Sequence, residues 1–347
     1  MKNRLWHMNA DFEVELGAAP GRPYRRTQHF AALNRRLSAQ LLWLAEPGDA
    51  LLVEDPWPES LSTDARRRGV ELVPTRDVDT QAGRLFTPWG WTPTAAEAGA
   101  RAGASVEPVP FDAVARVNSK LWSHALEVEM GWALPGAAVA RDTEELAEAA
   151  ARACPCAQDK WVLKSPYGFA ARERVLGRGP RVAGAQAAWA ARRFARGEAL
   201  IFQPWLEVVR EYGVALEVGR DGSHRVLGVS DLRTNGAGTG TGYVLGRPPA
   251  PRRSKELEAA AATVAARLHA EGYRGPAGVD ALEHAGGLHP LLEVNARYTM
   301  GFVALAVERA TGPAGPTLWD TKSGDLSPLR LEGDGRDVRT TGARRHS

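Results

Sequence analysis

Cysteine is scarce in this chain of 347 residues, which contains only Cys154 and Cys156. The two flank Pro155, and no second pair exists that would complete a four-ligand zinc site. A disulfide across a single residue would be strained, so we expect both thiols to be reduced. A reduced pair favours a reducing compartment.

Long apolar segments are also missing. The first 16 residues, MKNRLWHMNADFEVEL, lack the apolar core of a signal peptide. No segment approaches the roughly 20 consecutive apolar residues that span a bilayer. With the reduced thiols, these absences predict a cytoplasmic protein without a membrane partner.

An excess of one charge is absent as well. The 44 basic residues nearly balance 41 acidic ones, giving a net charge of +3 and a pI near 9.0. This balance lacks the concentrated basic stripe of a nucleic-acid binder, although it permits a polyanionic small ligand. With 44% hydrophobic and 24% charged residues, the composition is that of a globular protein. The length predicts two or three packed units.

Two common phosphate-binding motifs do not occur. The chain has no GxxxxGK[ST] motif, and its glycine-dense segment 234–242, TNGAGTGTG, does not read GxGxxG after a strand. We interpret this segment as a loop that closes over a ligand, with a flexible surface loop as the alternative. Arg233 and Asn235 lie at its mouth. The Arg233 guanidinium suits bidentate contact with a phosphoryl group or a carboxylate.

What is present begins with alternating strands and helices. Residues 50–54 and 69–73 are apolar runs that predict buried strands, with a helix over 62–68 between them. Thr94 and Glu97 form a capping-box pattern that predicts the start of a further helix. Strands separated by helices indicate a parallel sheet with helices on its faces.

Two prolines in segment 106–111 mark the end of this first unit. We divide the chain into residues 1–115, 116–200, 201–312 and a polar, partly disordered tail over 313–347. In the middle units the pattern predicts helices over 119–130, 143–153, 186–196 and 254–270, and strands over 161–164, 200–203, 212–218 and 226–229.

The segment from Gly275 to Arg297, GPAGVDALEHAGGLHPLLEVNAR, predicts a β-hairpin with a turn at Gly286 and Gly287. In this register Asp280 faces Glu293, Asn295 follows on the same face, and Arg297 lies two residues beyond. Opposed like charges are destabilising on a sheet, so a hard cation such as Mg²⁺ would stabilise the group. The alternative is an exposed hairpin with solvated acids, and Pro290 can shift the register.

Two lysines stand at the ends of predicted elements. Lys120 opens a helix, where a cation costs about 0.3–1 kcal/mol unless it serves an anion. Lys164 ends a strand before the loop SPYG, a position from which its ammonium can reach a phosphate. Either lysine alone is also consistent with a solvated surface charge.

The run Gln203-Pro204-Trp205-Leu206 follows a predicted strand and cannot continue it, because proline lacks a backbone donor. Backbone groups left free in this way can bind an adenine edge, with Trp205 or Leu206 as an apolar wall. Glu211 can accept from ribose hydroxyls. The alternative is a proline-kinked linker.

In order and spacing, these features together resemble the ATP-grasp superfamily over about residues 117–309, with VNSK, WVLKSPYG, IFQPWL and LLEVNAR as the matching segments. The resemblance implies a two-lobed ATP-grasp domain of α+β type after a Rossmann-like α/β pre-ATP-grasp domain. It also implies site residues. Asp280, Glu293 and Asn295 would bind two Mg²⁺ ions, with Mn²⁺ as a substitute, and Lys120 and Lys164 would hold ATP phosphates. Gln203, Trp205 and Leu206 would hold adenine and Glu211 ribose, while Arg233, Asn235 and Arg297 would act at the transferring phosphoryl group.

The sequence departs from the family pattern at three places. Gln203 stands where glutamate is frequent, Gly278 where an arginine occurs in D-alanine-ligase-like members, and the loop after Lys164 is bulky and basic. Arg172 or Arg174 in that loop can contribute positive charge toward phosphate or substrate.

The resemblance implies an ADP-forming carboxylate–amine ligase that makes an amide through an acyl phosphate. We expect amino-acid or peptide substrates, while the oligomeric state, a homodimer included, stays open. Two other classes remain: an ATP-binding regulator or scaffold without turnover, and a phosphotransferase with the same ATP site.

Overall fold

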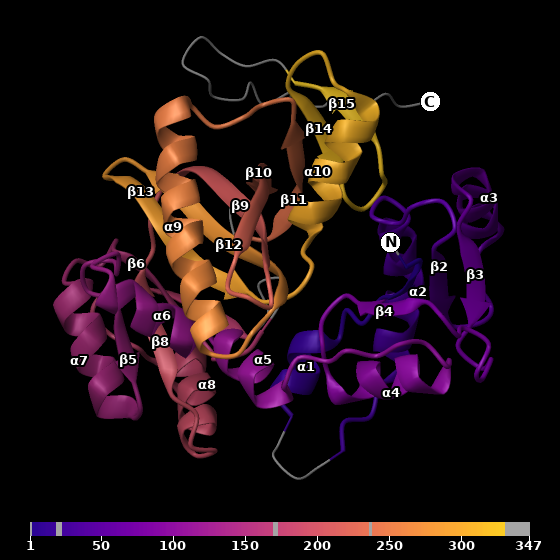
Figure 1. Cartoon of the computed structure of the whole chain (residues 1–347). Coiled ribbons are helices and arrows are strands. Elements are labelled where there is room, and N and C mark those ends of the chain that lie inside the picture. Colours follow the sequence, from indigo (N-terminus) through magenta and orange to yellow (C-terminus); the bar gives the residue numbers. More distant parts are fainter. Residues whose placement is uncertain (1, 19–22, 169–172, 236–237, 330–347) are drawn as a thin grey trace, which may run out of the picture.

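The computed structural model describes residues 2–18, 23–168, 173–235 and 238–329. These described residues form three sheets. In Figure 1 the first domain and the small lobe within residues 138–204 lie on opposite sides of the largest sheet. No helix in these ranges is long and apolar enough to cross a bilayer.

The first domain is a parallel sheet, as the alternation of strands and helices predicted. Its strand order is β3-β2-β1-β4, and each pair in it is parallel. The strands are β1 (Arg4–His7), β2 (Ala50–Val53), β3 (Glu71–Pro74) and β4 (Leu85–Pro88), and the helices are α1 (Phe12–Leu16), α2 (Gln28–Leu41), α3 (Glu59–Arg68) and α4 (Pro93–Arg101).

Capping residues determine where the helices of this domain begin and end, and one predicted cap lies at a different residue. Helix α3 ends at Gly69, whose φ of 67° is left-handed as a C-cap glycine requires. Helix α4 is capped by Thr92, whose hydroxyl accepts from the Ala95 N–H, so the predicted capping box at Thr94 is wrong. Pro93 fits the first helical position and moves the cap two residues earlier.

A small antiparallel sheet, with order β5-β8-β6-β7, forms the second unit. It contains β5 (Ala138–Ala140), β6 (Lys160–Lys164), β7 (Arg174–Arg178) and β8 (Leu200–Pro204), covered by α7 (Thr143–Ala153) and α8 (Gly184–Phe194). Trp161 and Leu163 are buried in the core with these helices. Because side chains alternate, Lys164 points to the opposite face.

The largest sheet is antiparallel, with order β13-β12-β9-β10-β11-β14-β15. Its strands are β9 (Val208–Val218), β10 (His224–Thr234), β11 (Gly240–Leu245), β12 (Gly275–His284), β13 (Gly287–Asn295), β14 (Thr317–Asp320) and β15 (Leu326–Pro328). Helix α9 (Pro251–Ala270) packs Leu257 and Val264 against Tyr212 and Val214 on one face. Helices α5 (Phe111–Val117), α6 (Lys120–Glu129) and α10 (Met300–Thr311) complete the unit.

Two boundaries differ from the divisions drawn on the sequence. Strand β8 continues to Pro204 in the smaller sheet, so the larger sheet begins only at Val208. Within the segment expected to be a polar tail, β14 and β15 pair with each other and extend the larger sheet. The sequence gives no strand signal here because β15 is an exposed edge strand, which needs no apolar face.

Candidate functional site

The hairpin of β12 and β13 places the predicted acids opposite each other. Asp280 pairs with Glu293, and Gly278 pairs with Asn295. The turn, however, lies at Ala285 and Gly286 rather than at Gly286 and Gly287, since His284 pairs with Gly287. A register shift beyond Asp280, in the stretch of β13 that contains Pro290, restores the predicted facing.

The surroundings of Asp280 disfavour the charged form of its carboxyl group. Burial raises its pKa to about 7, and the negative charge of Glu293 adds to this rise. The Asn295 amide donates to Asp280 Oδ2 at 3.0 Å and partly offsets it. The site therefore gathers negative charge that a cation would stabilise.

Two lysines approach this group from different elements. Lys120 Nζ donates to Glu293 Oε1 at 2.6 Å and to the Gly168 carbonyl at 3.0 Å. Lys164 Nζ donates to Gln203 Oε1 at 2.6 Å. The pKa of Lys164 is lowered to about 8, chiefly by burial; the charge of Glu293 opposes this change, and the charge of Lys120 adds to it.

Arg297 connects the hairpin to the first domain. Its Nε donates to Glu13 Oε1 at 2.7 Å, its Nη2 to Asn295 Oδ1 at 3.0 Å and its Nη1 to the Tyr298 carbonyl at 2.9 Å. The guanidinium is thus held between Asn295 and a carboxylate of α1.

Glu211 lies on the same face of the larger sheet as Asp280, because it pairs with Leu282 two residues along β12. The Thr234 hydroxyl donates to Glu211 Oε1 at 2.6 Å. Burial raises the pKa of Glu211, against the charges of Arg174 and Lys164. Arg174 lies 5.9 Å from the Trp205 ring centroid, whereas Arg172 falls outside the described ranges.

Part of the segment proposed for adenine is already engaged. Gln203 is buried and accepts from Lys164, and the Trp205 N–H donates to the Lys160 carbonyl at 2.8 Å. The backbone N–H of Trp205 is therefore not available to an adenine base, because it continues the hydrogen bonding between β8 and β6 as far as Lys160. The side chains of Trp205 and Leu206 remain partly exposed.

Arg233 is not brought to this group. It alternates with Leu232 and Thr234 along β10, so its side chain lies on the face opposite Glu211. There its charge acts on the buried Asp231, which accepts from Arg210 Nε at 2.9 Å. A role for Arg233 at the phosphoryl group therefore stays a prediction, and alternation along β10 places its side chain on the other face of the sheet from Glu211.

Asn235 organises the loop that follows β10. Its Oδ1 accepts from the Thr239 N–H at 3.0 Å, and its carbonyl accepts from the Gly238 N–H at 2.7 Å. These contacts shape the loop mouth and do not reach Asp280 or Glu293.

A buried carboxylate behind the site was missed by the sequence analysis. Glu127 of α6 is fully buried and contacts His124 Nδ1 at 2.9 Å and His289 Nε2 at 3.0 Å. Although burial raises it, these two histidines lower the pKa of Glu127 overall. The spacing of His124 and Glu127 on one helix face was a usable signal, but His289 comes from the distant strand β13.

The donor set fits magnesium. Asp280, Glu293 and Asn295 offer hard oxygen atoms, and Mg²⁺ usually takes one or two carboxylates together with substrate phosphates. Within the described ranges, no three His, Cys, Asp or Glu side chains converge as a complete metal site. An ion here would need further oxygen ligands from water or a phosphate.

The fold has solved counterparts, although no family model and no curated protein matches the chain. The biotin carboxylase domain of 2-oxoglutarate carboxylase from Hydrogenobacter thermophilus, solved with MgADP and bicarbonate, superposes with a TM-score of 0.52 at 14% identity, over 80% of this chain and 67% of that chain. Pyruvate carboxylase from Rhizobium etli gives 0.54 at 15% identity, over 88% and 27%. N5-carboxyaminoimidazole synthetase from Staphylococcus aureus gives 0.52 at 11% identity, over 92% and 81%. At these identities the likeness establishes the fold alone.

Proposed function

We propose that this chain, which has the ATP-grasp fold preceded by a parallel-sheet domain, is an ADP-forming ligase that joins a carboxylate to an amine. The observation that carries this proposal is the convergence of the opposed pair Asp280 and Glu293 with Asn295 and Lys120. Two carboxylates and a carboxamide can hold Mg²⁺, and through the ion and Lys120 they can bind the phosphates of a nucleoside triphosphate.

In this proposal the two lobes share the nucleotide. Lys120 and Lys164 hold phosphates from the α6 and β6 sides, and Asp280, Glu293 and Asn295 hold Mg²⁺. The ion, when bound, would neutralise charge on the phosphate oxygens. Trp205 and Leu206 flank the adenine through their side chains, with Gln203 behind them, and Glu211 accepts from the ribose.

The proposed reaction has two steps. A carboxylate oxygen attacks the γ-phosphorus of ATP, and ADP leaves as an acyl phosphate forms. The amine loses a proton to solvent, and its neutral nitrogen then attacks the acyl carbon. The bond from that carbon to the phosphate oxygen breaks, inorganic phosphate leaves, and the nitrogen loses a second proton as the amide forms. The protein itself forms no covalent bond in this reaction. It accelerates phosphoryl transfer by positioning the reactants and by placing the positive charges of Lys120, Lys164, Arg174 and Arg297 near the phosphoryl group.

We propose amino acids or short peptides as the substrates. The test is a screen of the twenty proteinogenic amino acids and their dipeptides for stimulated ADP release with MgATP. We expect ADP and inorganic phosphate as products, and Glu293→Gln to abolish them. Release of AMP and pyrophosphate would contradict the mechanism, and tight MgADP binding without turnover would favour a regulator instead.

A further inference from the structure

Helix α1 carries a carboxylate of the first domain to the edge of the proposed active site. Glu13, in the second position of this short helix, accepts from Arg297 with a single oxygen, Oε1. Both Nε and Nη2 of Arg297 bind that one atom. Asn295, one of the three proposed magnesium ligands, accepts from the same guanidinium through Oδ1.

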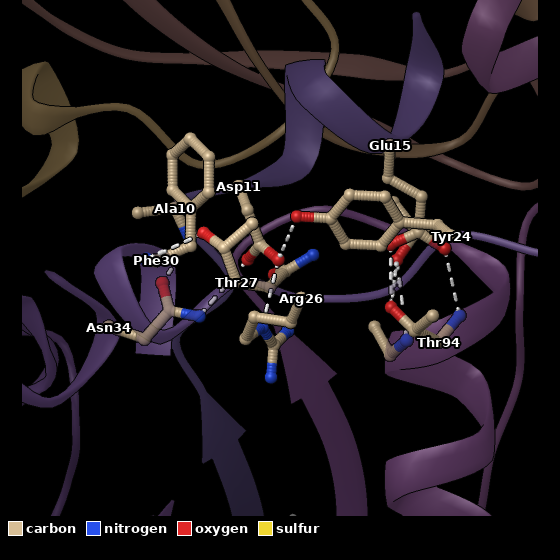
Figure 2. A network of polar contacts seen from close by, with 12 residues as sticks. Ala10, Asp11, Glu15, Tyr24, Arg26, Thr27, Phe30, Asn34 and Thr94 are labelled. Atoms are coloured by element: carbon tan, nitrogen blue, oxygen red, sulfur yellow. Dashed lines mark hydrogen bonds and ion pairs between the residues drawn. The ribbon is translucent and has the colours of Figure 1, made fainter. Parts of the chain in front are cut away.

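The start of α1 is fixed by a buried carboxylate. Asp11 Oδ2 accepts from the Tyr24 hydroxyl at 2.9 Å and from Arg26 Nε at 2.8 Å, while its Oδ1 accepts from Asn34 at 3.0 Å (Figure 2). Asp11 has no exposed surface. Three partners from α2 and the segment before it therefore hold the residue that precedes α1.

The other end of α1 is fixed in the same way. Glu15 accepts from the Thr94 N–H at 3.0 Å and from the Thr94 hydroxyl at 2.5 Å (Figure 2). Thr94 belongs to α4, so α1 is tied to both flanks of the first domain. Glu13 lies between two anchored acids, and its position is set by the domain rather than by Arg297 alone.

The second oxygen of Glu13 is available. Across residues 2–18, 23–168, 173–235 and 238–329, Oε2 has no hydrogen-bond partner, and the side chain keeps 10% of its surface exposed. A carboxylate that served only to anchor Arg297 would gain from a bidentate contact through both oxygens. The observed contact leaves one acceptor oxygen on a carboxylate that shares the Arg297 guanidinium with Asn295.

The charge of this oxygen indicates its ligand. The phosphates and the carboxylate substrate are anions, and Lys120, Lys164 and Arg297 serve them; a carboxylate beside them repels both. The one reactant that is cationic at neutral pH is the amine. We propose that Glu13 Oε2 binds the ammonium group of the acceptor, an amino acid or peptide, and so determines which amine is captured; this inference rests on the proposed ligase function.

The test separates charge recognition from support of Arg297. Glu13→Gln keeps the size of the side chain and an oxygen acceptor for Arg297 but removes the charge. The wild type and the variant receive MgATP and an equimolar mixture of the twenty proteinogenic amino acids, with and without hydroxylamine. Hydroxylamine is mostly uncharged near neutral pH and traps an acyl phosphate as a hydroxamate.

We expect Glu13→Gln to lower the rate of amide formation about 10- to 100-fold, the effect of losing a hydrogen bond between charged groups. Hydroxamate formation should change by less than about threefold, because a neutral acceptor does not need the carboxylate. Glu97→Gln is the control: it removes an exposed carboxylate of the first domain, on α4, and both rates should stay near the wild type.

Equal losses in both assays would overturn the inference, because Glu13 would then act only through Arg297. Unchanged rates in both assays would overturn it as well. If the wild type itself gives neither ADP nor hydroxamate, the proposed function has failed, and the inference fails with it for a reason that the wild-type control identifies.

Discussion

At the scale of single residues, the carboxyl groups of Asp280 and Glu293 lie opposite each other in the pairing of β12 with β13. Asp280→Asn removes one of the two charges. Without divalent ions we expect the free energy of unfolding to stay level or to rise by up to about 1 kcal/mol, because like charges opposed on a sheet are destabilising. With magnesium present, the variant should lose the magnesium-dependent part of its ADP affinity.

Urea unfolding and calorimetry measure the two effects. Asp325→Asn, at an exposed position just before β15, is the control and should change neither. A marked loss of stability together with unchanged ADP affinity would contradict a metal role for Asp280.

Lys164 predicts a pH dependence of binding. Its pKa is lowered to about 8, chiefly by burial, so about half of these side chains have lost their charge at that pH. An ordinary lysine keeps its charge to about pH 10. Affinity for MgADP that relies on this charge is fully present below the pKa of the free protein and declines as pH rises above it, by at most about tenfold per pH unit.

Calorimetric titrations between neutral and alkaline pH measure this slope. In Lys164→Met the affinity should be lower and the slope should vanish. A variant that binds more weakly but keeps the wild-type slope would assign the pH dependence to another group.

At the scale of elements, four side-chain contacts join α6 and the residue that follows α5 to β13 and the residue that follows β13. Asn118 accepts from the Ala296 N–H, Ser123 accepts from the Val294 N–H, Lys120 binds Glu293, and Glu127 binds His289. Since a carboxylate only accepts, both histidines must donate to Glu127, which fixes their tautomers. The orientation of Lys120 therefore depends on a buried contact two turns away.

Glu127→Ala would leave two buried histidine N–H groups without an acceptor. We expect it to lower the free energy of unfolding by about 2–4 kcal/mol and to weaken MgADP binding. Glu127→Gln should cost less, because its amide supplies an acceptor for one histidine and a donor for the other.

The control is Glu283→Gln. Glu283 also joins a helix to the hairpin, through Arg253 of α9, but it has no contact with Lys120. If Glu283→Gln weakens MgADP binding as much as Glu127→Ala does, the effect reflects general loosening and not the position of Lys120.

The sequence predicted elements with clear periodicity and missed those defined by distant partners. The hairpin acids were paired correctly even though the turn is one residue away, because the shift near Pro290 compensates. Strands β1 and β4 were not predicted: RLWH carries two polar residues, and His7 is buried only because β2 and β4 flank it. Glu13 and Glu127 were missed for the same reason, since their partners lie 284 and 162 residues away.

At the scale of the whole molecule, α1 sits where the first domain meets the larger sheet. Gly90, just after β4, has no room for a side chain, because a Cβ there would come within 2.4 Å of the Phe12 ring. Gly90→Ala should push α1 away, lower the free energy of unfolding by about 1–3 kcal/mol through overpacking and weaken the Glu13–Arg297 contact.

Gly315→Ala is the control, since nothing lies within 4 Å of its Cβ. Thermal unfolding and the rate of ADP release check both variants. Gly90→Ala with wild-type stability and rate would show that α1 can shift without consequence for the site.

The lowered pKa of Lys164 has a practical consequence for chemistry on the protein. An unprotonated amine is a nucleophile, and the lowered pKa of Lys164 raises the unprotonated fraction of its side chain near neutral pH. A small acylating reagent near neutrality should therefore modify this side chain at a higher intrinsic rate than a surface lysine, and peptide mass mapping would locate the adduct. A nucleotide analogue that carries an electrophile should label the proposed ATP site at Lys164.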